Sequence, residues 1–185
     1  MLLDSAISVF ADKGFEATSI TDITTQAGLA DGMFYNYYHD KQELLGAVAT
    51  GLAIEITSRI NDEMDGVENA IVSVATATAR ILDTVRQEPE WVEVLLDGIR
   101  IVPVLQSSVV QFLKKDLELG VTQNRFNAEI DVLLVNQVLS LISTAVLLDG
   151  EQQDATVRRT CEAVLILLGV ASGKAAVAVT KVLDR

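Results

Sequence analysis

The sequence predicts an all-α protein, with a small three-helix domain at the N-terminus and a larger helical domain after it. Half of the 185 residues are hydrophobic, and only two are proline. Apolar residues recur at three- and four-residue spacing along most of the chain, which is the period of an α-helix. Glycine, proline and Asp-Gly pairs interrupt these runs and divide them into separate helices.

The first expected helix covers residues 2–13. Leu3, Ile7 and Phe10 fall on one face of it, because residues three or four apart lie on the same side of a helix. Gly14 follows as the expected C-terminal stop, since glycine readily adopts the backbone conformation that ends a helix.

The next segment predicts two short helices joined by a tight turn. Thr18 or Ser19 can cap the first of them, and Asp22 complements its positive N-terminal end. Gly28 provides the backbone freedom for a sharp turn into a second element at residues 30–38. Two helices joined so closely cross steeply and leave one free to enter a DNA major groove. The segment therefore predicts a helix-turn-helix.

A third helix is expected to begin at Asp40, which with Glu43 forms an Asp-x-x-Glu variant of the capping box. It should run over residues 41–64 into the second domain and end at Asp65-Gly66. The tail at 171–185 either extends the last helix or adds a short one. The remaining expected helices cover residues 67–88, 90–102, 104–119, 128–148 and 154–170, with a loop at 121–127.

The N-terminal sequence resembles one family in particular. The strings AISVFADKGFEATSITDITTQAGL and GMFYNYYHDKQELL are similar to the DNA-binding domain of TetR-type transcriptional regulators over about the first 48 residues. The matching features are a Phe-x-x-x-Gly-Phe run at 10–15, the aromatic run at 35–38 and Lys41. The resemblance implies a helix-turn-helix DNA-binding domain at 1–46 and a helical effector-binding and dimerisation domain at 47–185. It also implies a dimeric, ligand-responsive repressor of a palindromic operator.

The resemblance assigns roles to the predicted DNA-binding residues, with Phe34 and Tyr38 turned inward. Asn36 can pair with adenine, Met33 can touch a thymine methyl group, and Asp31 can accept from cytosine. Tyr35, Tyr37 and Lys41 are expected to meet phosphates, which position a protein without reading sequence. Asp31 and Met33 depart from the commoner family pattern of Lys and Thr or Ser. The full predicted set is Thr18, Ser19, Ala30, Asp31, Gly32, Met33, Tyr35, Asn36, Tyr37 and Lys41.

The net negative charge of the chain is unfavourable for binding DNA. The net charge is −12 overall, and residues 1–50 carry a net −5 because Lys13 and Lys41 face seven acidic side chains. DNA affinity usually depends on neutralisation of phosphates by Lys and Arg. We favour the interpretation that a basic N-terminal arm is missing from this chain. The alternative is a TetR-like dimer that binds small molecules or proteins but not DNA.

The two late helices are apolar on most of their circumference, so most of each helix must be buried. The resemblance implies that they pair with their copies in a homodimer. The expected dimer-interface residues are Val135, Leu139, Ile142, Val146, Leu167 and Val170.

The resemblance also implies an effector site in the second domain, where apolar residues are accompanied by a few polar groups. The acidic chain favours a neutral or cationic hydrophobic compound. The expected pocket residues are Trp91, Leu95, Ile99, Arg100, Gln106, Phe112, Asn136 and Ser140.

Catalysis finds little support. His39 is the only histidine and lies in an expected turn, and Cys161, the only cysteine, lies in an apolar helix. The sequence shows no metal-ligand spacing, phosphate-binding loop or nucleophile elbow, so no catalytic, metal or cofactor site is expected. Polar residues interrupt the most apolar stretch, and no signal peptide begins the chain. We therefore expect a cytoplasmic protein with no membrane contact.

Overall fold

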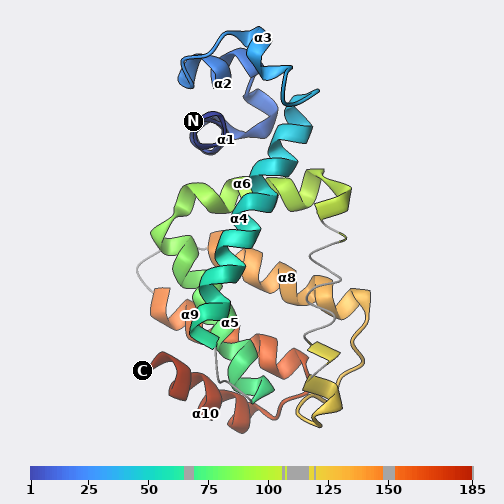
Figure 1. Ribbon diagram of the computed structural model, residues 1–185. Coiled ribbons are helices and arrows are strands. Elements are labelled where there is room, and N and C mark those ends of the chain that lie inside the picture. Colours follow the sequence, from blue (N-terminus) through green and yellow to red (C-terminus); the bar gives the residue numbers. More distant parts are fainter. Residues whose placement is uncertain (65–68, 106, 108–116, 119, 148–152, 185) are drawn as a thin grey trace. The chain divides into compact units, whose positions relative to one another are not determined.

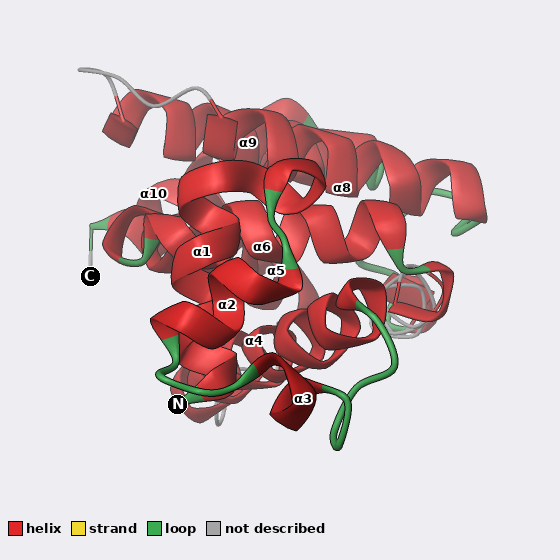
Figure 2. Ribbon diagram, turned by 90° about the horizontal axis from the view of Figure 1, so that it is seen from above, coloured by secondary structure: helices red, strands yellow, loops and turns green. Residues whose placement is uncertain are grey.

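The computed structural model describes residues 1–64, 69–105, 107, 117–118, 120–147 and 153–184, and all the regular structure among them is helical (Figure 2). The all-α fold is as predicted. The chain divides into two compact units. Unit 1 contains Met1–Thr57 and Glu88–Ser108, and unit 2 contains Ser58–Gln87 and Val109–Arg185. The expected functional division between residues 46 and 47 stays a prediction.

The helices follow the expected order (Figure 1). The long helix that was expected at 41–64 has these ends in the structure, and the tail forms a separate helix. Most of the expected helix at 104–119 lies outside the described residues. The observed helices are α1 Leu2–Ala17, α2 Ile20–Gln26, α3 Asp31–Phe34, α4 Lys41–Met64, α5 Ala70–Gln87, α6 Pro89–Ile101, α8 Val132–Leu147, α9 Gln153–Leu167 and α10 Ser172–Leu183.

Local sequence signals fix both ends of α2. The Ser19 hydroxyl accepts a hydrogen bond from the Asp22 N–H at 3.1 Å, and the Asp22 carboxylate accepts from the Ser19 N–H at 2.9 Å. This reciprocal pair is a capping box, and it assigns the cap to Ser19. At the other end Gly28 has φ +66°, and the Leu29 N–H donates to the Thr24 carbonyl at 2.8 Å. Glycine at this left-handed position ends the helix and makes the predicted turn.

The second element of the helix-turn-helix is shorter than predicted. The expectation of a helix over 30–38 is wrong, because α3 ends at Phe34 and turns follow it, including a bond from the Tyr37 N–H to the Phe34 carbonyl at 3.0 Å. Tyrosine and asparagine are weak helix formers, and the cap of α4 follows closely. The Asp40 carboxylate accepts from the Glu43 N–H at 2.8 Å. Four residues of α3 and the turn after it therefore form the recognition segment.

One apolar core holds the helices of unit 1 together. Phe34 from α3 and Leu44 and Leu45 from α4 have no exposed surface. Because each of these helices contributes to the same core, α3 is held by side-chain packing rather than by its own short length. The buried members are Ala6, Val9, Phe10, Ile23, Phe34, Leu44, Leu45, Val48, Leu52 and Val94.

Unit 2 has a separate core, formed by residues of α5, α8, α9 and α10 and of the chain before α8. The chain between α9 and α10 contains Gly169 at φ +82°, where the Asn127 N–H donates to the Leu168 carbonyl at 3.1 Å. The fully buried side chains in this core include Val135, Val164, Leu165, Leu168, Ala175 and Val179.

Cys161 is expected to resist modification in the native protein. The side chain is 1% exposed, its thiol donates to the Ala75 carbonyl at 3.7 Å, and burial raises the pKa of the thiol to about 12. Because the thiolate is the reactive form, a disulfide reagent at pH 8 should release almost no thiol signal from the folded protein. The same reagent should titrate one thiol per chain in denaturant. Rapid reaction of the folded protein would contradict this burial.

Candidate nucleic-acid interface

The recognition segment presents three large side chains to solvent. Met33 is 42% exposed, Tyr35 59% and Tyr37 67%, and Ala30, Gly32 and Asn36 are also exposed. Large apolar and aromatic side chains gathered on a surface commonly mark an interaction site. These six residues belong to the predicted DNA-binding set, and the structure brings them together on α3 and its flanking turns.

The neighbouring aromatic residues lie inward, as expected. Phe34 is fully buried, and the half-buried Tyr38 packs against the same core. The rings of Phe34 and Tyr35 are 5.3 Å apart and nearly perpendicular, and those of Phe34 and Tyr38 are 5.9 Å apart. Edge-to-face contacts of this kind favour one orientation of the rings. Phe34 therefore anchors the segment from which Tyr35 projects.

Asp31 connects α3 to α2. Its carboxylate accepts a hydrogen bond from the Thr21 hydroxyl at 2.7 Å and another from the Thr24 hydroxyl. The two hydroxyls, Thr24 first, hold the pKa of Asp31 below its ordinary value. Sequence analysis missed both threonines, although their three-residue spacing places them on one side of α2. The expected contact of Asp31 with cytosine stays a prediction.

The structure corrects the expectation that Thr18 faces DNA. The Thr18 side chain is 3% exposed, and its hydroxyl donates to the Gly14 carbonyl at 2.8 Å. Ser19 is exposed, but its hydroxyl also donates to the Asp22 carboxylate at 2.7 Å. Thr18 lies inside unit 1 because it closes the end of α1. The side chain of Ser19 caps α2, and the DNA contact expected of this exposed residue stays a prediction.

Lys41 has partners inside the protein. Its ammonium donates to the Phe15 carbonyl at 2.5 Å, to the Thr18 carbonyl at 2.7 Å and to the Glu16 carbonyl at 3.3 Å. It also lies 4.4 Å from the centre of the Phe15 ring. The phosphate contact expected of Lys41 stays a prediction, but all three donors of this ammonium already have carbonyl partners.

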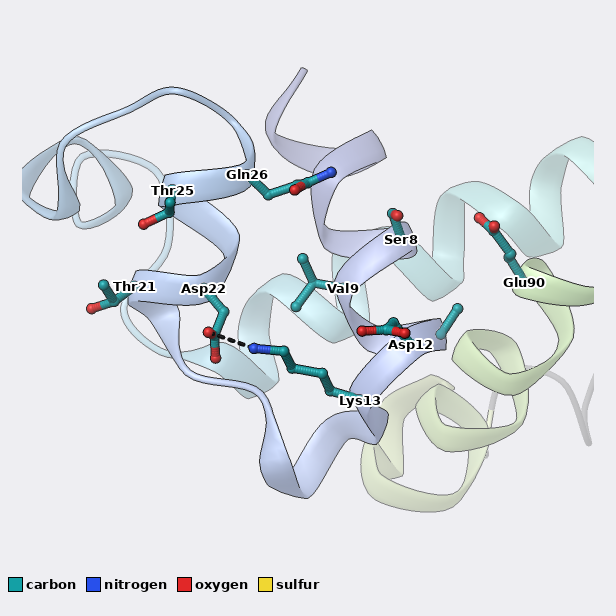
Figure 3. Close-up of a pocket in the computed structure, with 10 residues that line it drawn as sticks. Ser8, Val9, Asp12, Lys13, Thr21, Asp22, Thr25, Gln26 and Glu90 are labelled. Carbon is teal, nitrogen blue, oxygen red and sulfur yellow. Dashed lines mark hydrogen bonds and ion pairs between the residues drawn. The ribbon is translucent and has the colours of Figure 1, made fainter.

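A hollow of about 550 Å³ lies beside α1 and α2 (Figure 3). Across it Lys13 and Asp22 form an ion pair at 2.7 Å, and the hydrogen bond from Lys13 contributes most to lowering the pKa of Asp22. Asp12 and Glu90 also line the hollow, so its surface is mainly polar and acidic. None of the residues expected to bind an effector lines it.

The predicted effector residues are divided between the two units. Trp91, Leu95, Ile99 and Arg100 belong to α6 of unit 1, whereas Asn136 and Ser140 belong to α8 of unit 2. The Arg100 guanidinium pairs with Asp97 at 2.6 Å. Gln106 and Phe112 lie outside the described residues. The pocket stays a prediction.

The structure corrects half of the predicted dimer interface. Val135, Ile142 and Val170 are at most 9% exposed and belong to the core of unit 2, so they cannot meet a partner subunit. Leu139, Val146 and Leu167 are half-buried and pack against the same core. The expectation for Val135, Ile142 and Val170 is wrong because a helix that is apolar all round gives little indication of its outward face. For Leu139, Val146 and Leu167 it stays a prediction.

On the outward faces, Leu133 of α8 is 66% exposed and Ile166 of α9 is 48% exposed. Neither these helices nor any other helix in the described ranges has the length and apolarity needed to cross a membrane.

An all-helical chain whose N-terminal unit exposes residues of a short helix-turn-helix belongs structurally to the helix-turn-helix proteins. The sequence model described as "Bacterial regulatory proteins, tetR family" matches residues 2–48. Residues 2–48 are therefore similar to the N-terminal domain of the TetR family. The family model and the curated relatives that match the chain are described as transcriptional regulators.

Curated relatives match part of the chain. The HTH-type transcriptional regulator YvdT of Bacillus subtilis (strain 168) is 37% identical over 68 residues, which are 37% of this chain and 35% of YvdT. The HTH-type transcriptional repressor KstR2 of Mycobacterium tuberculosis (strain ATCC 25618 / H37Rv) is 30% identical over 70 residues, 38% of this chain and 35% of KstR2. The chain thus matches about a third of the length of these relatives.

Solved structures share the fold over nearly the whole chain. RolR in complex with resorcinol has a TM-score of 0.75 and 21% identity, covering 97% of this chain and 91% of RolR. FadR from Bacillus subtilis in complex with stearoyl-CoA has a TM-score of 0.72 and 19% identity, covering 90% of this chain and 95% of FadR. At these identities the likeness establishes the fold alone.

Proposed function

We propose that the protein is a transcriptional repressor that binds a palindromic DNA operator as a homodimer and responds to a small effector. The observation that carries the proposal is the exposure of Met33, Tyr35 and Tyr37 around the buried anchor Phe34. These residues lie within the segment that matches the family. An exposed aromatic surface on a helix-turn-helix fits a partner that offers both phosphates and base edges.

In this proposal the hydroxyls of Tyr35 and Tyr37 donate hydrogen bonds to DNA phosphates. Asn36 pairs with adenine, and Met33 contacts a thymine methyl group. The bonds from Thr21 and Thr24 to Asp31 support the proposal, because they fix the first residue of α3 against α2. A fixed segment loses less conformational freedom on binding.

We propose that α8 and α9 pair with their copies through their outward faces, which include Leu133 and Ile166. A two-fold dimer presents two recognition segments to the two halves of a palindrome. For the effector we propose a small hydrophobic compound, in line with the resorcinol bound by RolR. Such a ligand weakens DNA binding if it binds more tightly to a state with a different spacing of the recognition segments.

A second function has one specific observation in its favour. Unit 1 contains three side-chain cations, Lys13, Lys41 and Arg100, and each is engaged by a partner within the unit. Free cations usually provide the affinity for phosphates. The alternative is therefore a TetR-like dimer that binds a small molecule or a protein without binding DNA.

Selection from a random pool of DNA duplexes at low salt tests the first proposal. We expect enrichment of a palindromic motif. Tyr35→Phe and Tyr37→Phe should each reduce affinity for that motif by roughly 5- to 10-fold, the effect of losing about 1 kcal/mol or slightly more from one hydrogen bond. Tyr38→Phe is the matched control, because this tyrosine packs against the core and its replacement should leave DNA affinity nearly unchanged.

The same selected duplex allows the effector proposal to be tested, with resorcinol and stearoyl-CoA as the first probes. Failure to enrich any motif, with the dimer intact in sedimentation, would overturn the DNA-binding proposal and favour the second function.

A further inference from the structure

Lys41 joins the two ends of the helix-turn-helix. The carbonyls that accept its hydrogen bonds, those of Phe15, Glu16 and Thr18, lie immediately before α2. Lys41 itself is the first residue of α4 and follows the recognition segment. The ammonium of Lys41 therefore links the residue that follows the segment 19–40 to the residues that precede it.

The contact between the Lys41 ammonium and these carbonyls has the chemistry of an interaction that stabilises the fold. The last carbonyls of a helix have no partner within the helix and carry partial negative charge, so a lysine ammonium stabilises them. The three donors of Lys41 meet the carbonyls of Phe15 and Glu16 at the end of α1 and that of Thr18, the residue that follows the helix. The ammonium also lies 4.4 Å from the centre of the Phe15 ring. By contrast, a cation in the first turn of α4 opposes the dipole of that helix. Stabilisation of the end of α1 thus explains the position of this lysine without a contact to DNA phosphate.

We propose that Lys41 is a positioning residue and not a phosphate ligand. It holds the start of α4 to the end of α1 and so fixes the angle at which the recognition segment meets DNA. The part of this inference that concerns DNA rests on the proposed function. It follows that unit 1 binds phosphates mainly through uncharged donors such as the Tyr35 and Tyr37 hydroxyls.

This inference predicts that the DNA affinity of unit 1 depends only weakly on salt concentration. The logarithm of DNA affinity falls with the logarithm of salt concentration in proportion to the number of phosphates that cations neutralise. Lys13 and Arg100, the other side-chain cations of unit 1, are paired with Asp22 and Asp97. A phosphate ligand contributes about 1 to this slope, whereas a positioning residue contributes nothing.

Lys41→Met in the full-length chain tests the proposal in two measurements. Methionine keeps an unbranched side chain but removes the three hydrogen bonds. We expect the melting temperature to fall by about 3–6 °C. We also expect affinity for the selected operator, measured well below that melting temperature, to fall on the order of tenfold, with the salt slope unchanged. Lys13→Met is the matched control, because it removes an equal charge from an exposed ion pair and should lower the melting temperature much less.

Lys41→Arg separates charge from geometry. Arginine binds phosphate at least as well as lysine, so a phosphate ligand would tolerate this change. A planar guanidinium does not reproduce the contacts of an ammonium with three converging carbonyls, so we expect Lys41→Arg to lose operator affinity as well.

Two outcomes would overturn the proposal: a salt slope that decreases by about 1 per protomer in Lys41→Met, or a melting temperature equal to that of the wild type. The melting measurement needs no DNA. Absence of DNA binding by the wild-type protein would therefore overturn the proposed function. The melting temperature of Lys41→Met would still test whether the hydrogen bonds of Lys41 hold the start of α4 to the end of α1.

Discussion

Gly169→Ala is expected to destabilise the protein by about 2–5 kcal/mol. Gly169 has φ +82°, a left-handed conformation that costs other residues roughly 1–2 kcal/mol. A Cβ at this position would also lie 2.8 Å from the Asn127 carbonyl oxygen. Because this neighbour is backbone, it cannot move aside as a flexible side chain would.

The position matters because several hydrogen bonds meet there. The Gly169 N–H donates to the Ile166 carbonyl and the Val170 N–H to the Leu165 carbonyl, a pattern that ends α9. Urea unfolding followed by far-ultraviolet circular dichroism measures the loss. Gly173→Ala is the matched control in unit 2, since a Cβ there meets nothing within 4 Å, and it should be neutral or slightly stabilising. Equal unfolding midpoints for Gly169→Ala and the wild type would show that the backbone of Gly169 does not lie as close to the Asn127 carbonyl as the structure places it.

The elements with strong local signals were predictable from the sequence. Ser19 and Asp22 mark the start of α2, Gly28 ends it, and Asp40 with Glu43 starts α4, and the structure has a cap or turn at each. These signals act within a few residues, so a single sequence contains all the information they need. The family resemblance was likewise carried by closely spaced residues.

The contacts that the sequence did not reveal belong to side chains whose partners are distant in sequence. Thr18 could serve either as a cap or as a DNA contact until the end of α1 was seen to enclose it. Lys41 reaches carbonyls that lie 23 to 26 residues earlier, which no helical period indicates. In the same way, Val135 was assigned to an interface because α8 is apolar on most sides, and only the packing of unit 2 identifies its inward face.

Phe34→Ala should destabilise unit 1 by about 3–5 kcal/mol, the usual cost of truncating a fully buried phenylalanine. Phe34 is 0% exposed and belongs to a four-residue helix that has little stability of its own. Trp91, the only tryptophan, packs against the same core, so its fluorescence can follow unfolding of unit 1 in urea. A fluorescence midpoint unchanged from the wild type would rule out Phe34 as the anchor of α3.

Met33→Ala is the informative neighbour for this experiment. Met33 is 42% exposed and precedes Phe34 in the same helix, so its truncation should change stability by less than about 0.5 kcal/mol. In the proposed function Met33→Ala should instead weaken the preference for thymine at one operator position. Phe34→Ala should reduce binding to all sequences alike, because it removes the support of the whole recognition segment. If both substitutions reduced stability equally, α3 would have to be held by contacts other than the packing of Phe34.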